Sequence, residues 1–286
     1  DVYKRQYIYI DGYIFGLQVA NVWSDYSRCI GDLLFHRGPS PRGLSHDSWD
    51  SPIRDYDGGD VDGDGVNELV FGSYDNKLYI VGAYGEEELA YWQPGVIVGA
   101  PALADLDDDG DLEVIFTTQN GNYGDIYAIH HDGEEVQGFP ADIDEKMLVG
   151  PAVGDLEGDG IIDIVIVTWD DHIYALDSDG NIKSGFPVLS TNRFNSPATL
   201  VDLDGNGTLE IIAGNDSGLL HILHHDGTEM STFDTGDDIR GGISVSDIDN
   251  DGSYELLFSG YDDMIHVLNP CLLYTSDAAD DTPCVD

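Results

Sequence analysis

Short apolar runs recur along the chain, and polar turns separate one run from the next. Each run is too short for a helix and is rich in β-branched and aromatic residues, which favours β-strands. A first set of runs covers 69–71, 114–116, 164–167, 211–212 and 256–258. A second set, after a polar turn, covers 78–81, 126–129, 173–176, 220–223 and 265–268. No segment shows helical periodicity, so the pattern predicts an all-β chain.

Two further runs complete each repeat. Asp-Gly turns at 132–133, 179–180 and 226–227 follow the second set and lead to a weaker strand, which is a hairpin signal. Segments of small residues lie before the first set, at 101–104, 151–154 and 197–200. Four short strands in every 45 to 50 residues predict the blades of a β-propeller. The small side chains suit an innermost strand, where blades crowd around the axis.

A nine-residue acidic motif precedes each run of the first set. It reads Asp-x-Asp-x-Asp-Gly-x-x-Glu with small variations, and successive copies start 45, 50, 47 and 45 residues apart. The copies span 60–68, 105–113, 155–163, 202–210 and 247–255. A glycine always stands at position 6, where it permits a sharp turn; these are Gly65, Gly110, Gly160, Gly207 and Gly252.

The alternating acids predict an oxygen cage in each loop. Side chains at positions 1, 3, 5 and 9 and the carbonyl at position 7 are hard ligands that select calcium, so up to five Ca²⁺ ions are expected. The first two loops would use Asp60, Asp62, Asp64, Val66 and Glu68, and Asp105, Asp107, Asp109, Asp111 and Glu113. The third and fourth would use Asp155, Glu157, Asp159, Ile161 and Asp163, and Asp202, Asp204, Asn206, Thr208 and Glu210. The fifth would use Asp247, Asp249, Asp251, Ser253 and Glu255.

The alternative is that these loops are polar hairpin turns that hold no metal. Mutual repulsion within an uncompensated cluster of four carboxylates argues against it. Individual loops differ, because Glu157 is bulkier than aspartate at position 3 and Asn206 lacks a charge at position 5. The fourth loop is therefore expected to bind its ion most weakly.

Two short elements flank the first repeat: Phe71-Gly72 after the loop, and Gly99-Ala100-Pro101 before the next loop. With the acidic motif, they make residues 51–270 resemble the FG-GAP and VCBS-type repeats of calcium-binding β-propellers, known from integrin α-subunits and bacterial surface proteins. Elsewhere the elements are degenerate, as in Gly150-Pro151 and Gly241-Gly242. The resemblance implies a propeller with calcium in the hairpin between the first two strands of each blade. It implies no particular ligand.

The ends of the chain do not share the repeat. Residues 1–6 and 271–286 resemble translated sequencing-adapter sequence and are set aside as non-native. Residues 7–50 are interpreted as the remnant of a preceding blade with a long insertion. The whole is expected to be an incomplete fragment of a larger ring. Cys29 is the one cysteine outside the excluded ends, so no disulfide framework is predicted.

Charge limits the partners that the chain can have. With 56 acidic and 11 basic residues, the formal net charge is −45, which argues against nucleic acid and against anionic membrane surfaces. Extracellular calcium modules bind at about 10⁻⁴ to 10⁻³ M, so the loops favour a secreted or cell-surface location. Direct membrane insertion is not expected.

These features favour a non-catalytic platform for adhesion or for binding a protein or carbohydrate. Two alternatives stay open: the propeller of a polysaccharide lyase-like enzyme, and a structural spacer in a large adhesin. The enzyme depends on a basic, aromatic segment over 21–54, which holds Arg28, Arg37, Arg42 and Arg54.

Two sets of aromatic and imidazole side chains also recur in register. His130-His131 and His224-His225 precede Asp-Gly turns, and a structural role is favoured over zinc binding. A second set lies in the second run of each repeat: Tyr79, Tyr127, Tyr174, His221 and His266. A layer packed between blades is favoured for this set over a sugar-stacking platform.

Overall fold

The computed structural model of the protein describes residues 5–10, 13–18, 36–37 and 56–269. Every regular element in these ranges is a β-strand, which confirms the predicted all-β class. This part of the chain therefore holds no helix that could cross a membrane.

Five antiparallel sheets, here called sheets 1 to 5, follow one another between residues 56 and 268. In each sheet the strands are hydrogen-bonded in sequence order. Sheet 1 contains β4 (Tyr56–Gly59), β5 (Glu68–Gly72), β6 (Lys77–Val81) and β7 (Glu87–Trp92). Sheet 2 contains β8 (Ala102–Ala104), β9 (Glu113–Thr117), β10 (Asp125–Ile129) and β11 (Ala141–Asp142).

The remaining three sheets repeat this order. Sheet 3 contains β12 (Ala152–Gly154), β13 (Asp163–Val167), β14 (His172–Leu176) and β15 (Val188–Leu189). Sheet 4 contains β16 (Thr199–Val201), β17 (Glu210–Gly214), β18 (Leu219–Leu223) and β19 (Glu229–Asp234). Sheet 5 contains β20 (Ser244–Ser246), β21 (Glu255–Ser259) and β22 (Ile265–Leu268).

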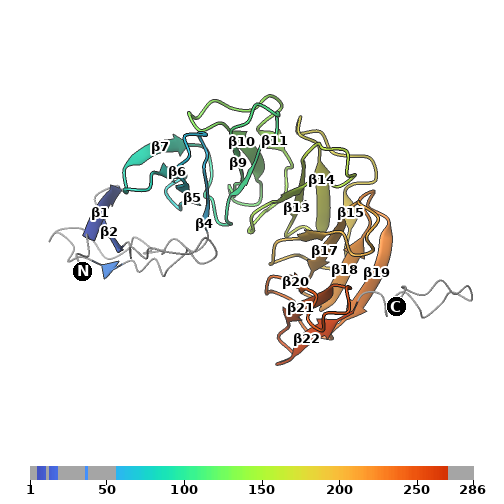
Figure 1. Cartoon of the computed structure of the whole chain (residues 1–286). Helices are drawn as coiled ribbons and strands as arrows, with labels where there is room; N and C mark the ends of the chain where they lie inside the picture. Colours follow the sequence, from blue (N-terminus) through green and yellow to red (C-terminus); the bar gives the residue numbers. More distant parts are fainter. Residues whose placement is uncertain (1–4, 11–12, 19–35, 38–55, 270–286) are drawn as a thin grey trace, which may run out of the picture.

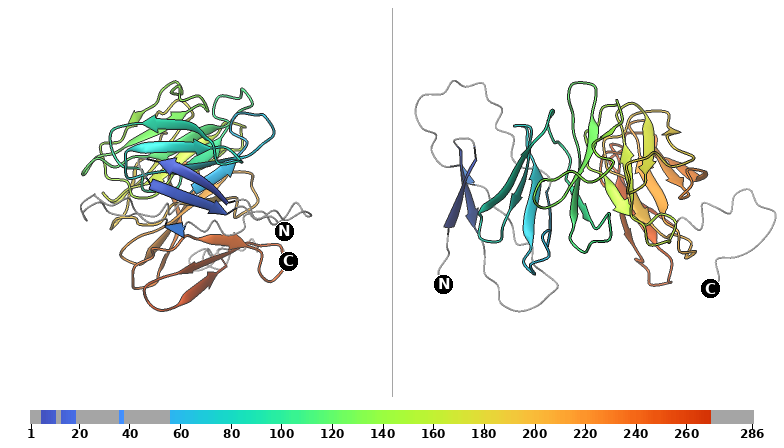
Figure 2. Two further views of the ribbon diagram at one scale, coloured as in Figure 1. Left: turned by 90° about the vertical axis from the view of Figure 1, so that its left-hand side faces the viewer. Right: turned by 90° about the horizontal axis from the view of Figure 1, so that it is seen from above.

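The sheets are arranged side by side along an arc (Figure 1). The first strands of neighbouring sheets, β4, β8, β12 and β16, contact each other along the inside of this arc. The described strands do not close into a ring (Figures 1 and 2). This is the arrangement of successive propeller blades, so the predicted fold is confirmed, with the ring left open.

The core lies between the sheets. The second strands β9, β13 and β17 are buried at all their residues, because each is covered on both faces by neighbouring sheets. One apolar cluster joins sheets 2 and 3 through residues such as Ile115, Ile126, Ile164 and Ile166. Equivalent clusters join sheets 1 and 2, sheets 3 and 4, and sheets 4 and 5.

Two glycines allow neighbouring elements to approach closely. A Cβ atom on Gly72 would overlap the side chain of Ile97, and one on Gly99 would overlap the backbone of Gly150. Gly72 belongs to the Phe-Gly element and Gly99 to the Gly-Ala-Pro element. Both elements are therefore required by packing at the junction of sheets 1, 2 and 3.

The recurring aromatic set forms an internal layer. Tyr79, Tyr127, Tyr174 and His221 are buried. Tyr79 stacks on Phe71 with ring centroids 5.4 Å apart, and Tyr127 stacks on Phe116 at 5.2 Å. Their burial leaves no free ring face for a sugar, so the structural interpretation holds and the stacking platform is wrong for these four residues.

The terminal segments are described only in part. Residues 271–286 lie outside the described residues, and so do 1–4 at the other end. Between them, β1 (Arg5–Ile10), β2 (Tyr13–Gln18) and β3 (His36–Arg37) form a three-stranded antiparallel sheet. Most of the basic segment over 21–54, with Cys29, falls outside the described ranges, so its predicted role as an insertion stays a prediction.

Candidate metal-binding loops

Every acidic loop connects the first and second strands of its sheet. The first strand ends one residue before position 1, and the second strand begins at the position-9 acid. The loops therefore lie in the hairpin that the sequence resemblance implied. All five position-9 acids are buried where they enter the core strands; they are Glu68, Glu113, Asp163, Glu210 and Glu255.

The five loops share two hydrogen bonds that close them. The position-9 carboxylate accepts from the backbone N–H of position 2, with lengths of 2.6 to 3.2 Å. The position-1 carboxylate accepts from the N–H of the position-6 glycine at 2.6 to 3.2 Å. These glycines all have φ between 89° and 99°, which L side chains rarely adopt. The motif therefore specifies one backbone conformation five times.

The position-5 side chain adds a third shared bond. It accepts from the N–H of position 7 at 2.7 to 3.1 Å in all five loops. Polar side chains that hydrogen-bond two residues ahead stabilise turns of this kind. Each loop thus turns its acidic side chains back onto its own backbone.

The first, second and fourth loops each bring three acids within reach of one ion. In the first, second and fourth loops, one carboxylate oxygen each from positions 1, 3 and 9 lies within 4.8 Å of the others. These groups are Asp60, Asp62 and Glu68; Asp105, Asp107 and Glu113; and Asp202, Asp204 and Glu210. An all-oxygen donor set at this spacing suits calcium.

Several of these oxygens are buried without a partner. The Oδ1 atoms of Asp60, Asp105 and Asp247 have no hydrogen-bond partner among the described residues, although each is shielded from solvent. Buried carboxylate oxygens are normally hydrogen-bonded or bound to a metal, because desolvation of a bare charge is costly. The position-1 acids of the first, second and fifth loops therefore fit a cation.

Burial also perturbs the position-9 acids. Desolvation raises the pKa of Glu113 and of Glu210 above the ordinary glutamate range. Desolvation likewise raises the pKa of Glu68, and repulsion from Glu88 and Asp62 adds to the shift. A bound cation would stabilise the charged form of each group. The first, second and fourth loops therefore have an unfavourable electrostatic environment when only protein groups surround them.

The third loop differs, because a lysine enters it. The Nζ atom of Lys183 lies 2.6 Å from Oδ1 of Asp163 and also donates to Oε2 of Glu157. Lys183 is largely buried there, since its side chain is 17% exposed. Burial opposes the charge, but the bonds to Asp163 and Glu157 outweigh it and raise the pKa of Lys183.

The position-9 acids of three other loops also contact a side chain from the end of the third strand. His130 Nδ1 lies 3.0 Å from Glu113 Oε1, and His224 Nδ1 lies 3.6 Å from Glu210 Oε1. Asn269 donates to Glu255 Oε1 at 3.2 Å. The structural role predicted for the first histidine of each pair is thus visible as a contact with the loop. That contact was not predicted from the sequence, although the shared register of the two histidines was a signal for it.

The position-7 carbonyls that were predicted as ligands have no contact that tests the assignment. Their residues, Val66, Asp111, Ile161, Thr208 and Ser253, stay predicted ligands.

One acid at the opposite end of the strands, Asp216, is paired with protein cations. Asp216 Oδ2 accepts from Arg193 Nε at 2.6 Å and from Asn195 at 2.7 Å, and its Oδ1 accepts from Arg240 Nε at 2.9 Å. The bonds to Asn195, Arg193 and Arg240 outweigh burial and lower the pKa of Asp216. Nearby, Lys146 Nζ lies 3.6 Å from the ring centroid of Trp169, and the Arg193 guanidinium covers the same ring at 4.6 Å.

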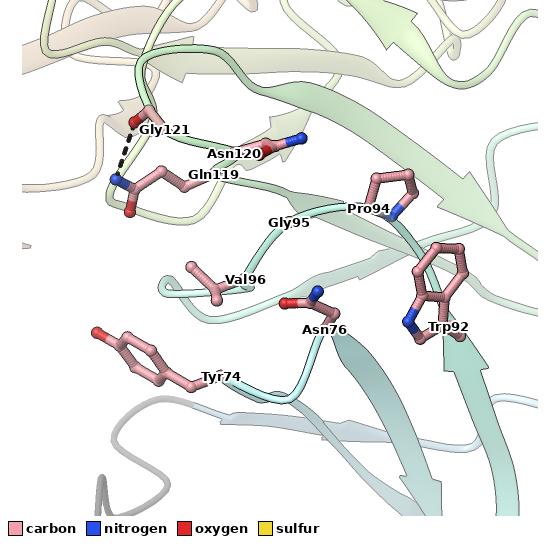
Figure 3. Close-up of a pocket in the computed structure, with 9 residues that line it drawn as sticks. All are labelled: Tyr74, Asn76, Trp92, Pro94, Gly95, Val96, Gln119, Asn120 and Gly121. Carbon is pink, nitrogen blue, oxygen red and sulfur yellow. Dashed lines mark hydrogen bonds between the residues drawn. The ribbon is translucent and has the colours of Figure 1, made fainter. Parts of the chain in front are cut away.

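An open depression of about 530 Å³ lies at this same end, between sheets 1 and 2. Figure 3 shows Tyr74 and Trp92 at its borders, with Asn76 and Val96 between them and Gln119 on the opposite side, next to Gly121. Tyr74 is 53% exposed and Trp92 is 62% exposed. Large aromatic side chains that stay accessible beside polar groups are typical of binding surfaces.

Comparisons with known proteins agree with this architecture. Residues 155–213, which include the third and fourth loops, match a family model described as FG-GAP-like repeat. No curated protein sequence matches the chain. The fold is similar to that of BBS1N, solved in complex with ARL6DN, with a TM-score of 0.59 and 15% identity over 96% of this chain and 81% of that one.

A second similar structure is BamB from Moraxella catarrhalis, with a TM-score of 0.54 and 16% identity. The alignment covers 71% of this chain and 55% of that one, so the chain spans little more than half of the BamB structure. At these identities the likeness concerns the fold alone.

Proposed function

We propose, from the match of residues 155–213 to the FG-GAP-like repeat model, that the chain is a calcium-binding β-propeller that acts as a non-catalytic platform outside the cell. Its ligand would be a protein or a carbohydrate. Calcium would have a structural role, in which it neutralises the acidic loops and fixes the hairpin between the first two strands of each sheet.

The unpartnered buried carboxylate oxygens carry the proposal. Asp60, Asp105 and Asp247 each keep one Oδ1 atom shielded from solvent and free of hydrogen bonds, at the same position of three loops. In the first two loops this acid belongs to a trio of carboxylates within 4.8 Å. Repulsion within such a trio would open the loop unless a cation offsets it.

Calcium would be held by residues that already face one another. Positions 1, 3, 5 and 9 would supply side-chain oxygens, and position 7 would supply its carbonyl oxygen. The cation would supply positive charge that the loops lack. The shared backbone hydrogen bonds would hold the loop in the conformation that accepts it.

The extracellular location follows from the calcium that such loops require. Extracellular calcium modules have dissociation constants of about 10⁻⁴ to 10⁻³ M, and sites of that affinity would stay empty in the cytosol. The net charge of −45 adds to this, because a saline medium screens self-repulsion.

The ligand surface is proposed at the strand ends opposite the loops. The depression bordered by Tyr74 and Trp92 offers exposed aromatic area beside polar side chains. BBS1N, which has a similar fold, was solved in complex with ARL6DN, and this supports a protein as one class of ligand. The lyase alternative rests on the basic segment over 21–54, and no contact in the described residues supports it.

Thermal unfolding tests the metal. The melting temperature is measured in about 5 mM calcium, a concentration at which such sites are filled. It is also measured in excess EDTA, and in magnesium at the same ionic strength. We expect a fall of many degrees in EDTA and little rescue by magnesium, which demands a smaller octahedral site. Equal melting temperatures in calcium and in EDTA would contradict the proposal.

A further inference from the structure

Lys183 reaches the third loop from the fourth-strand side of its own sheet. It lies three residues after Gly180, in the segment that leads from β14 to β15. Its ammonium group bonds to position 3 of the loop at Glu157 and to position 9 at Asp163. These are two of the three positions whose carboxylates meet in the first, second and fourth loops.

The same position in sheets 1, 2 and 4 holds no cation. Equivalent residues can be identified because Gly85, Gly133, Gly180 and Gly227 each donate their N–H to the carbonyl three residues earlier. Three residues after these glycines stand Glu88, Val136, Lys183 and Met230, in sheets 1 to 4. Val136 is buried, and Met230 packs against the core cluster of sheets 4 and 5.

Glu88 has the opposite sign, and its side chain is exposed. One position of the blade therefore carries an acid in sheet 1, an apolar side chain in sheets 2 and 4, and a cation in sheet 3.

A divalent ion and the Lys183 ammonium compete for the same oxygens. Each would have to bond Glu157 and Asp163, and two positive centres a few ångströms apart repel strongly where water is excluded. Lys183 is covalently tethered, so its local concentration exceeds that of calcium in any ordinary medium. A loop that already contains a tethered cation has little to gain from an ion.

We infer that Lys183 is a built-in replacement for the divalent cation in the third loop, so that this loop stays free of calcium while its neighbours bind it. The inference rests on the proposed calcium function and lowers the number of calcium ions expected per chain by one. It also reorders the loops, because the weakest site becomes the third, with its lysine, instead of the fourth, with Asn206.

The test exchanges the residues at this position between neighbouring sheets. Lys183→Met gives sheet 3 the residue of sheet 4, and Met230→Lys gives sheet 4 the residue of sheet 3. Bound calcium is counted per chain by equilibrium dialysis and mass spectrometry of the metal. We expect one more ion per chain in Lys183→Met and one fewer in Met230→Lys. Lys146→Met, which removes a lysine from the opposite end of the strands, should leave the count unchanged.

A second measurement uses no calcium. In excess EDTA, Lys183→Met should melt below the wild type, because Glu157 and Asp163 then face each other without a cation. Lys183→Gln, which keeps a hydrogen-bond donor of similar reach, provides the same test if the methionine variant folds poorly.

The outcomes separate this inference from the proposed function. If the wild type binds calcium and Lys183→Met binds the same number of ions, the inference is wrong and the calcium function stands. If neither binds calcium, the proposed function is wrong as well. A gain of one ion in Lys183→Met supports both.

Discussion

Asp216 at the turn end of the strands and Asp105 at the loop end are surrounded in opposite ways. At the turn end, Asp216 is enclosed by Arg193, Arg240 and Asn195, and all of its bonds are made within the protein. At the loop end, Asp105 is half-buried, and its Oδ1 atom is shielded from solvent but has no partner among the described residues. The comparison shows that burial alone does not identify a metal ligand. What distinguishes the loop end is a buried carboxylate for which the protein supplies no cation.

The third loop is the exception at the loop end. Lys183 gives it the kind of protein cation that Asp216 has at the other end. The third loop therefore has the position of a loop acid but the charge pairing of Asp216. It serves as a reference for the effects of substitutions at both ends of the strands.

The largest effect is expected from Glu113→Gln, at position 9 of the second loop. With calcium at 100 times its dissociation constant, loss of one ion should reduce the free energy of unfolding by about 3 kcal/mol. In EDTA the loss should be below about 1 kcal/mol, because a neutral amide relieves the desolvation that raises the pKa of Glu113. Urea unfolding under both conditions measures the difference.

Glu134→Gln is the matched control, since Glu134 is exposed on the same sheet. If Glu113→Gln lowers the free energy of unfolding equally with and without calcium, the loop end does not depend on a cation and the contrast with Asp216 is wrong.

A smaller effect, independent of calcium, is expected from Asp216→Asn. Loss of charge-assisted bonds to Arg193 and Arg240 should destabilise the protein by about 2 kcal/mol at neutral pH. The folded-state pKa of Asp216 is lowered, so its contribution is complete above the ordinary value of 3.8 and is lost as pH falls through the folded-state value. The gap between wild type and Asp216→Asn should therefore narrow below pH 3.8, as measured by urea unfolding across a pH series. A gap that depends on calcium would contradict the assignment.

The smallest effect is expected from Asn206→Asp in the fourth loop. The new carboxylate keeps the oxygen that accepts from Thr208 N and Oγ1, and it adds a charge to the ligand set. Calcium affinity at this loop should rise about tenfold, or ~1.4 kcal/mol, as measured by calorimetry. Asn122→Asp adds the same charge at an exposed position of the turn end and should leave the affinity unchanged.

Local signals in the sequence predicted the loops and the strands well. The nine-residue motif contains both the acids and the glycine whose positive φ the turn requires, so one local pattern specifies the hairpin. Strand order followed from the short spacing between apolar runs, since neighbouring antiparallel strands need only a turn.

Contacts made across a repeat were not predicted. Lys183 lies 20 residues from Asp163, and no local rule relates them. The sequence did contain a signal for this contact, because the equivalent position in neighbouring repeats holds the apolar residues Val136 and Met230. Likewise, Lys146, Arg193 and Arg240 recur at intervals of 47 residues, a periodicity that would have predicted a cationic row at the turn end. Hydrophobic periodicity does not report such positions, because it treats all polar residues alike.

The position-9 acid is also the first residue of the strand that fills the space between blades. The acid that is proposed to bind the ion is thus adjacent in sequence to residues such as Val114 and Ile211, which pack against the neighbouring sheets. Under the proposed function, a fall in calcium concentration would weaken the packing between neighbouring blades, and the effect would not be confined to a surface turn. The stiffness of the arc would then follow the ionic composition of the medium around it.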